Sequence, residues 1–118
     1  MKSSDFRQLT VWQKGMDLVV EIYKLVKKLP KEELYSLSDQ MRRAAVSIPS
    51  NIAEGRNRSS SKDFLRFLYM ARGSTAEIET QFYICVKLQY LKENDIEIAL
   101  NLCGEIGKML NAMIAKIN

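Results

Sequence analysis

The sequence of 118 residues contains no histidine, and this absence excludes several classes of active site. A Ser-His-Asp or Cys-His nucleophile, a histidine general base, a HExxH zinc site and a Glu-x-x-His di-iron site all need an imidazole. Glycine and proline are also scarce, with five and two residues. Because sandwiches and barrels need many turns, this scarcity argues against an all-β fold.

The two cysteines, Cys85 and Cys103, are too few for a disulfide framework and lack the CxxC spacing of zinc sites. Both fall at predicted core positions, so we expect buried free thiols in a reducing cytoplasm.

The N-terminal residues carry no signal-peptide pattern, and no apolar run reaches the length of about 18 residues that a membrane span needs. We therefore expect a cytoplasmic protein without a membrane partner.

Apolar residues recur at helical spacing in four segments, at about 9–29, 37–55, 62–91 and from residue 95 onward. In the first segment the predicted core stripe consists of Trp12, Met16, Val19, Tyr23 and Val26. Ser36, Ser60 and Asn94 each precede an acidic residue by three positions, a spacing that resembles a capping box and predicts a helix start. Pro49 interrupts the second segment, but the apolar phase continues, which favours a kinked continuation.

The predicted linkers, about 30–36, 56–60 and 92–94, are short. Short connections between helices imply antiparallel neighbours. The sequence therefore predicts an all-α protein with one domain over residues 1–118, an antiparallel up-down-up-down four-helix bundle.

The third segment carries a second apolar face opposite its core stripe. A helix that is apolar on both sides is buried all round or meets a partner, and a bundle helix always has a solvent side. We therefore predict an oligomer interface, the alternative being scattered surface aromatics. Its residues are Tyr69, Ala76, Tyr83, Ile84, Leu88 and Leu91. Gly73 stands in the middle of the same segment, where a glycine costs about 1 kcal/mol relative to alanine and allows another backbone to approach closely.

The net charge of +4 is concentrated in residues 39–72, where seven cationic side chains face three acidic ones. Six of the seven are arginine, whose planar fork suits phosphate or carboxylate. This cluster predicts a nucleic-acid-binding surface, the alternative being an ordinary solvated face. The candidates are Arg42, Arg43, Arg56, Arg58, Lys62, Arg66 and Arg72.

A polar stripe flanks the core stripe of the second segment. It consists of Gln40, Arg43, Ser47, Asn51 and Glu54. We interpret it as a hydrogen-bond network that fixes the register of neighbouring helices, the alternative being a ligand or partner groove. No pair of carboxylates has the spacing of a metal site on one inward face, so we expect no enzyme activity, no catalytic residue, no metal and no cofactor.

The run from Gln40 to Gly55, QMRRAAVSIPSNIAEG, resembles the signature of four-helix bundle proteins encoded by intervening sequences in bacterial 23S ribosomal RNA genes. Other matching pieces are Val11–Lys14, Leu29–Pro30 with Glu33 and Tyr35, and Ala71–Ser74 followed by Glu77, Glu79 and Thr80. These pieces follow one another in order across nearly the whole chain.

The resemblance implies an antiparallel four-helix bundle that assembles into a ring-shaped homopentamer. A related branch, the accessory variability protein of diversity-generating retroelements, implies a basic pentamer that binds nucleic acid and works with a reverse transcriptase. The family has no defined catalytic residue. We therefore expect a non-enzymatic homo-oligomer that binds RNA or DNA through its arginines, the alternative being a protein–protein adaptor or scaffold without nucleic-acid affinity.

Overall fold

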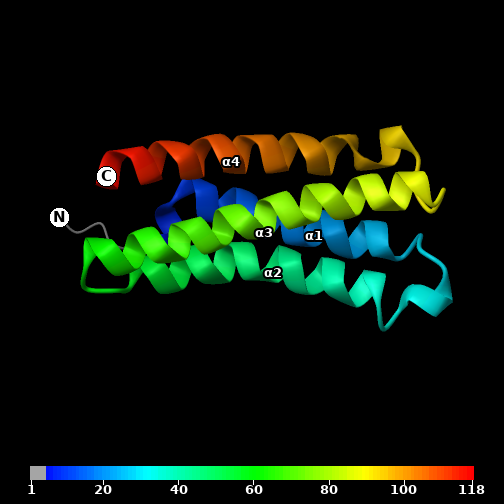
Figure 1. The fold of residues 1–118 in the computed structure, drawn as a ribbon, viewed down its shortest axis with the longest axis horizontal. Helices are drawn as coiled ribbons and strands as arrows, with labels where there is room; N and C mark the ends of the chain where they lie inside the picture. The colour runs from blue at the N-terminus through cyan, green and yellow to red at the C-terminus, as the bar shows by residue number, and fades with distance from the viewer. Residues whose placement is uncertain (1–4) are drawn as a thin grey trace.

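The computed structural model describes residues 5–118, which form four long helices joined by short connections (Figure 1). Three 3₁₀ turns lie before or between them, and the described residues contain no strand. The bundle measures 47 × 24 × 20 Å. The elements are η1 (Phe6–Gln8), α1 (Thr10–Val26), η2 (Lys31–Glu33), α2 (Leu37–Arg56), α3 (Ser61–Lys87), η3 (Glu93–Ile96) and α4 (Glu97–Ile117). The predicted domain begins in residues 1–4, which lie outside the described residues.

Each helix packs on two neighbours around one core. Both α1 and α3 pack on α2 and on α4. Figure 1 shows α3 in front of the bundle and α1 behind it, with α4 above and α2 below. The helices α1 and α3 therefore occupy diagonally opposite corners. The predicted all-α four-helix bundle is confirmed.

Three of the four predicted stripes form the core. Their fully buried members are Met41, Ala44, Ala45, Ile48 and Ile52 on α2, Phe67, Ala71, Thr75, Ile78, Phe82 and Cys85 on α3, and Ala99, Cys103, Ile106 and Leu110 on α4. Burial of one large aliphatic or aromatic side chain contributes about 1.5–3 kcal/mol. Both cysteines are free and buried, as predicted, and desolvation raises their pKa values to about 11 for Cys85 and about 12 for Cys103.

The predicted core stripe of α1 is wrong in part: Val26 is buried, and Trp12 and Val19 are partly buried against the core, but Met16 and Tyr23 are not. The buried residues are Val11, Leu18, Ile22, Leu25 and Val26, whereas Met16 and Tyr23 are exposed. The helix is apolar on two adjacent flanks, roughly a quarter turn apart at 100° per residue. Periodicity alone cannot choose between two such stripes, because the contacts with α2 and α4 decide which one is buried.

The helix α2 continues through Pro49, as predicted. Pro49 is buried, and it packs against Gly15 of α1. A Cβ atom at Gly15 would lie 3.4 Å from Ile48 Cγ2 and 3.5 Å from Pro49 Cβ. These are ordinary van der Waals distances, so α1 packs directly on α2 at this height and an alanine would fit at position 15.

The helix α3 ends at Lys87, four residues earlier than predicted. Gln89 has φ of 64°, and the amides of Gln89 and Tyr90 donate to the carbonyls of Val86 and Cys85. This pattern is a Schellman motif with glutamine where glycine is usual, so the sequence lacked the expected stop signal. The chain then turns Leu91 into the core, where it is 3% exposed. The assignment of Leu91 to an outer interface is therefore wrong.

Of the predicted helix caps, Ser60 is confirmed because its Oγ accepts a hydrogen bond from the Asp63 amide at 3.1 Å. Ser36 makes no such bond to Asp39, and its hydroxyl donates instead to Glu33 Oε1 at 2.7 Å. Near α4 the cap lies two residues earlier than predicted, since Asp95 Oδ2 accepts from the Lys92 amide at 2.8 Å.

Glu33 joins the α1–α2 connection to the end of α3. Its carboxylate accepts hydrogen bonds from the Ser36 hydroxyl at 2.7 Å, from the Leu37 amide at 3.3 Å and from the Tyr90 hydroxyl at 2.8 Å. These bonds, the one from Ser36 first, lower the pKa of Glu33 below its ordinary value of 4.5.

Among residues 5–118, no helix is long and apolar enough to cross a bilayer.

The lowered pKa of Glu33 predicts a pH-dependent contribution to stability. The charged carboxylate stabilises the fold fully above its ordinary value of 4.5. That contribution is lost as the pH falls through the lower folded-state pKa. Glu33→Gln should therefore lower the melting temperature at pH 7 and have a smaller effect near pH 3, measured by circular dichroism. An equal loss at both pH values would contradict this role, and Glu32→Gln, next to it and exposed, is the matched control.

Candidate nucleic-acid interface

The α2–α3 end of the bundle is built on one close contact. Gly55, buried near the end of α2, faces Phe67 of α3. A Cβ atom at Gly55 would lie 2.6 Å from Phe67 Cβ and 3.1 Å from Phe64 Cδ1, closer than side chains can pack. The absent side chain lets the two helices meet just before Arg56, the last residue of α2, and the loop that carries Arg58.

Two arginines contact the ring of Phe67. The guanidinium carbon of Arg66 lies 4.5 Å from the ring centroid, and that of Arg58 lies 4.9 Å away. Arg56 makes a similar contact with Phe64 at 5.8 Å. Cation–π contacts at such distances contribute about 0.5–1 kcal/mol at exposed sites. They hold three guanidinium groups at one end of the bundle.

The three acidic residues of the basic segment are each paired with one of its arginines. Arg43 pairs with Asp39 at 3.0 Å, Arg58 with Glu54 at 2.8 Å and Arg66 with Asp63 at 3.9 Å. All six side chains are substantially exposed, so these pairs orient the arginines more than they stabilise the fold. The net charge of residues 39–72 is +4 with these pairs included. The side chains of Arg43, Arg58 and Arg66 remain partly exposed to solvent.

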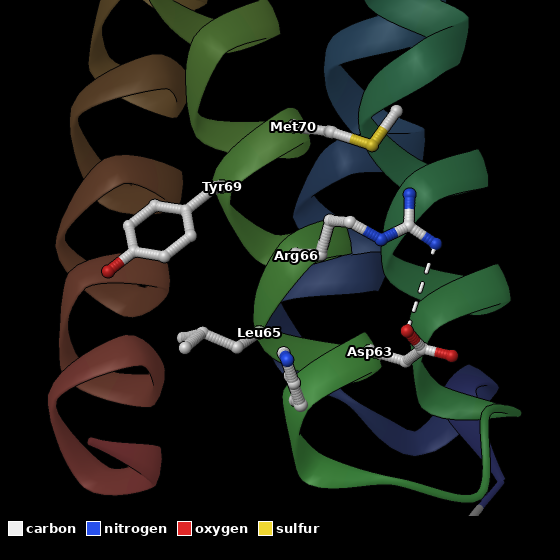
Figure 2. A pocket seen from close by; sticks show the side chains of 6 residues that line it. Asp63, Leu65, Arg66, Tyr69 and Met70 are labelled. Carbon is white, nitrogen blue, oxygen red and sulfur yellow. Dashed lines mark ion pairs between the residues drawn. The ribbon is translucent and has the colours of Figure 1, made fainter.

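A hollow of about 520 Å³ lies on the first turns of α3. It is lined by Lys62, Asp63, Leu65, Arg66, Tyr69 and Met70. Figure 2 shows Tyr69 and Leu65 pointing toward α4, and Arg66 and Met70 pointing toward α2. The hollow therefore combines two cations with an exposed aromatic ring. Cations bind phosphates and aromatic rings stack on bases, the two contacts of single-stranded nucleic-acid sites.

The structure does not gather all seven predicted cations on one surface. Arg42 lies over the Tyr23 ring of α1 at 6.0 Å and donates to the Leu34 carbonyl at 3.3 Å. Arg72 lies on the α4 side of the hollow, where its guanidinium carbon is 4.9 Å from the centroid of the Tyr69 ring and it donates to Asn111 Oδ1 at 3.0 Å. Only the loop and the start of α3 bring several cations together. We call this group of Arg56, Arg58, Lys62 and Arg66 the basic end.

The predicted polar stripe lines a groove of about 520 Å³ between α2 and α3. From α2 it has Gln40, Arg43, Ala44, Ser47 and Asn51, and from α3 Met70, Gly73, Ser74 and Glu77. The hydroxyl groups of Ser47 and Ser74 share a hydrogen bond of 2.6 Å across the two helices. Asn51 donates to the Ser47 carbonyl within α2, and Glu54 pairs with Arg58. Of the bonds made by this stripe within residues 5–118, the Ser47–Ser74 bond joins the two helices, while those of Asn51 and Glu54 stay within α2 and its following loop.

The outer face of α3 has a second, apolar half. Tyr83, Ile84 and Leu88 are exposed, and they line a hollow of about 420 Å³ with Thr80 and Lys87. Ala76 is also exposed. Tyr69, predicted with this face, belongs instead to the hollow of the basic end. The sequence did not predict that the outer face of α3 is divided between a basic end and an apolar half. It also did not predict that the Phe67 ring lies beneath two arginines, because the spacing of a buried aromatic residue does not indicate which side chains contact it.

Residues 5–118 include no group of three cysteine, aspartate or glutamate side chains placed to hold a metal ion.

The architecture is that of a four-helix bundle protein with a basic end. Residues 7–112 match the model of the 23S rRNA-intervening sequence protein family, so the chain belongs to that family. A search of curated proteins finds no significant match.

A solved structure supports the assignment. The chain resembles the crystal structure of a protein of unknown function from the S23 ribosomal protein family of Bacteroides thetaiotaomicron VPI-5482. The two are 28% identical, the match covers 89% of this chain and 98% of the other, and the TM-score is 0.82.

The Gly55–Phe67 contact predicts a strong effect of a single methyl group. Gly55→Ala should destabilise the fold by about 1–3 kcal/mol, because two helix backbones must separate to admit it. Chemical denaturation measures this loss. Gly104→Ala is the matched control, since its Cβ would meet nothing within 4 Å and alanine favours helix. A stability of Gly55→Ala equal to that of the parent chain would contradict the contact.

Proposed function

We propose that this protein is a non-catalytic homo-oligomer of the cytoplasm that binds nucleic acid through its basic end. The observation that carries the proposal is the grouping of Arg58, Lys62 and Arg66 beside an exposed tyrosine. Two of these cations are held by the Phe67 ring, which reduces the conformational entropy they lose on binding.

The chemistry of the basic end suits a phosphate backbone next to a base. Lys62 and Arg66 supply the donors for phosphate oxygens. Tyr69 is 41% exposed, with the guanidinium of Arg72 4.9 Å from its ring centroid, and the exposed part of the ring supplies a surface for stacking. The nearby acidic groups, Asp63 and Glu54, are already paired with arginines. Their repulsion of a phosphate is therefore partly offset.

Self-association multiplies a weak surface. The family resemblance implies a ring of five copies, and five subunits of +4 would carry about +20. Each phosphate contact adds a salt-dependent term to the affinity, so a repeated basic end binds a long strand far better than a single copy. The proposal that the protein is non-catalytic is supported by its lack of histidine and by the raised pKa values of both thiols.

A protein–protein adaptor is the second candidate. The observation that favours it is the polar groove between α2 and α3, which offers amide, hydroxyl and charged groups to an extended peptide. Nucleic-acid affinity separates the two candidates.

The nucleic-acid proposal predicts that Arg58→Glu with Arg66→Glu removes binding to a fluorescent single-stranded RNA at low salt, while the assembly stays intact. For the parent protein, the logarithm of the affinity should fall linearly with that of the salt concentration, by about 0.7 per phosphate contact on a single strand. Fluorescence anisotropy at several salt concentrations gives both quantities, with duplex RNA and RNA–DNA duplex as parallel probes.

Lys108→Glu with Lys116→Glu is the matched control, because it makes the same charge change at exposed positions of α4. It should keep most of the affinity. Equal losses in both double variants would mean that only total charge matters. No binding of any probe by the intact parent oligomer would overturn the nucleic-acid proposal and favour the adaptor.

A further inference from the structure

We propose that the apolar half of α3 in one copy binds the α1–α2 face of the next copy, with Tyr83 inserted into the groove between α1 and α2. This inference rests on the proposed self-association and names the two surfaces that meet. The sequence pointed to the α3 face alone. The partner surface includes Met16 and Tyr23, the two residues of the predicted α1 stripe that are exposed instead of buried.

The α1–α2 face is the second apolar surface of the subunit. Met16, Val20 and Tyr23 are exposed along α1, with Val20 57% exposed, and Val46 is exposed on α2. Beside them lies a groove of about 450 Å³, lined by Tyr23, Asp39, Arg42, Arg43, Val46 and Ser47. The subunit therefore presents a concave site in which the apolar groups of Tyr23 and Val46 lie beside polar and charged side chains.

The two faces stand at the same heights along the bundle. In one layer, Gly15 of α1 packs on Ile48, and the adjacent Ser47 is bonded to Ser74 of α3. Met16 is therefore level with Gly73.

In a second layer, Tyr23 of α1 lies under Arg42, and the adjacent Met41 contacts Cys85 of α3 at 3.7 Å between sulfur atoms. Tyr83 lies near the height of Cys85, so it is level with the α1–α2 groove. A rotation about an axis parallel to the bundle keeps these heights. It brings the α3 face of one copy against the α1–α2 face of another without any shift along the helices.

The shapes of the two faces are complementary. Tyr83 is 57% exposed and projects from α3, whereas the groove opposite it is hollow. Met16 and Val20 project from α1, whereas Gly73 and Ala76 leave space on α3. A Cβ atom at Gly73 would meet nothing within 4 Å, so no contact inside the subunit explains a glycine in the middle of this helix. A neighbouring side chain in that space would explain it.

The groove also matches the chemistry of tyrosine. Its wall contains the guanidinium of Arg42, which can stack on an aromatic ring, and the carboxylate of Asp39, which accepts a hydrogen bond from a phenol. Tyrosine is enriched at protein interfaces because it combines an apolar ring with a polar end. A second copy of this chain thus supplies a side chain that fits the groove.

The contact is head-to-tail, because α1 and α3 lie at opposite corners of the bundle (Figure 1). Each copy uses one face for each neighbour, and repeated contacts close into a ring or continue as a filament. A two-fold contact of α3 with α3 is the alternative, and the two arrangements differ in how variants complement each other.

Two single variants test the pairing. Val20→Glu disables the α1–α2 face, and Tyr83→Glu disables the α3 face. Each should be a folded monomer by analytical ultracentrifugation at micromolar concentration. Mixed in equal amounts, they should form a dimer of twice the subunit mass and nothing larger, because one intact pair of faces remains. An α3–α3 contact would instead leave Val20→Glu assembled and the mixture without a new species.

Ile98→Glu is the matched control, since Ile98 is an apolar residue of α4, 65% exposed and outside both faces. It should assemble like the parent. Gly73→Leu separates packing from folding: leucine favours helix over glycine, so the variant should melt no lower than the parent as a monomer, yet lose assembly. A monomeric parent would overturn the proposed self-association itself. An assembled parent with an assembled Val20→Glu or Gly73→Leu variant would overturn only the pairing inferred here.

Discussion

The close packing of α2 against both of its neighbours is the constraint on which the rest of the molecule depends. Gly15 of α1 packs on Ile48 and Pro49, and the absent side chain of Gly55 lets α2 lie on Phe67 of α3. These two contacts stand at different heights of one continuous helix. Together they fix the heights of α1 and α3 relative to each other, although those two helices occupy opposite corners. The positions of the exposed side chains follow from this arrangement.

The same packing divides the outer surface of α3 into two parts with different chemistry. Near the α2–α3 loop, Arg58 and Arg66 rest on a buried ring, and Lys62 and Tyr69 border an open hollow. Farther along, Ala76, Tyr83 and Ile84 form an apolar surface with few charges. One helix thereby offers a surface for phosphate and a surface for another subunit, and neither needs to overlap the other.

Much of the fold could be predicted because helical periodicity was unambiguous in three segments. The stripes of α2 and α4 each have one main apolar face, and the two apolar faces of α3 are opposite each other and easily told apart, so the core residues of all three helices followed from spacing. The α1 segment has two adjacent apolar flanks, and the choice between them depends on which neighbours it meets. The end of α3 was missed because Gln89 adopts a left-handed conformation that glycine usually signals.

The sequence by itself determined the fold class and the segment that carries the net charge, because composition and periodicity are properties of the chain alone. The family followed from the resemblance of the run from Gln40 to Gly55 to a known signature. It also placed the polar stripe on one side of α2. Only the tertiary structure decided which cations stand together, since Arg42 and Arg72 point to different neighbours of their helices. Only the tertiary structure turned the unburied stripe of α1 into a surface level with the α3 face, because relative height between diagonal helices arises from contacts that both make with α2.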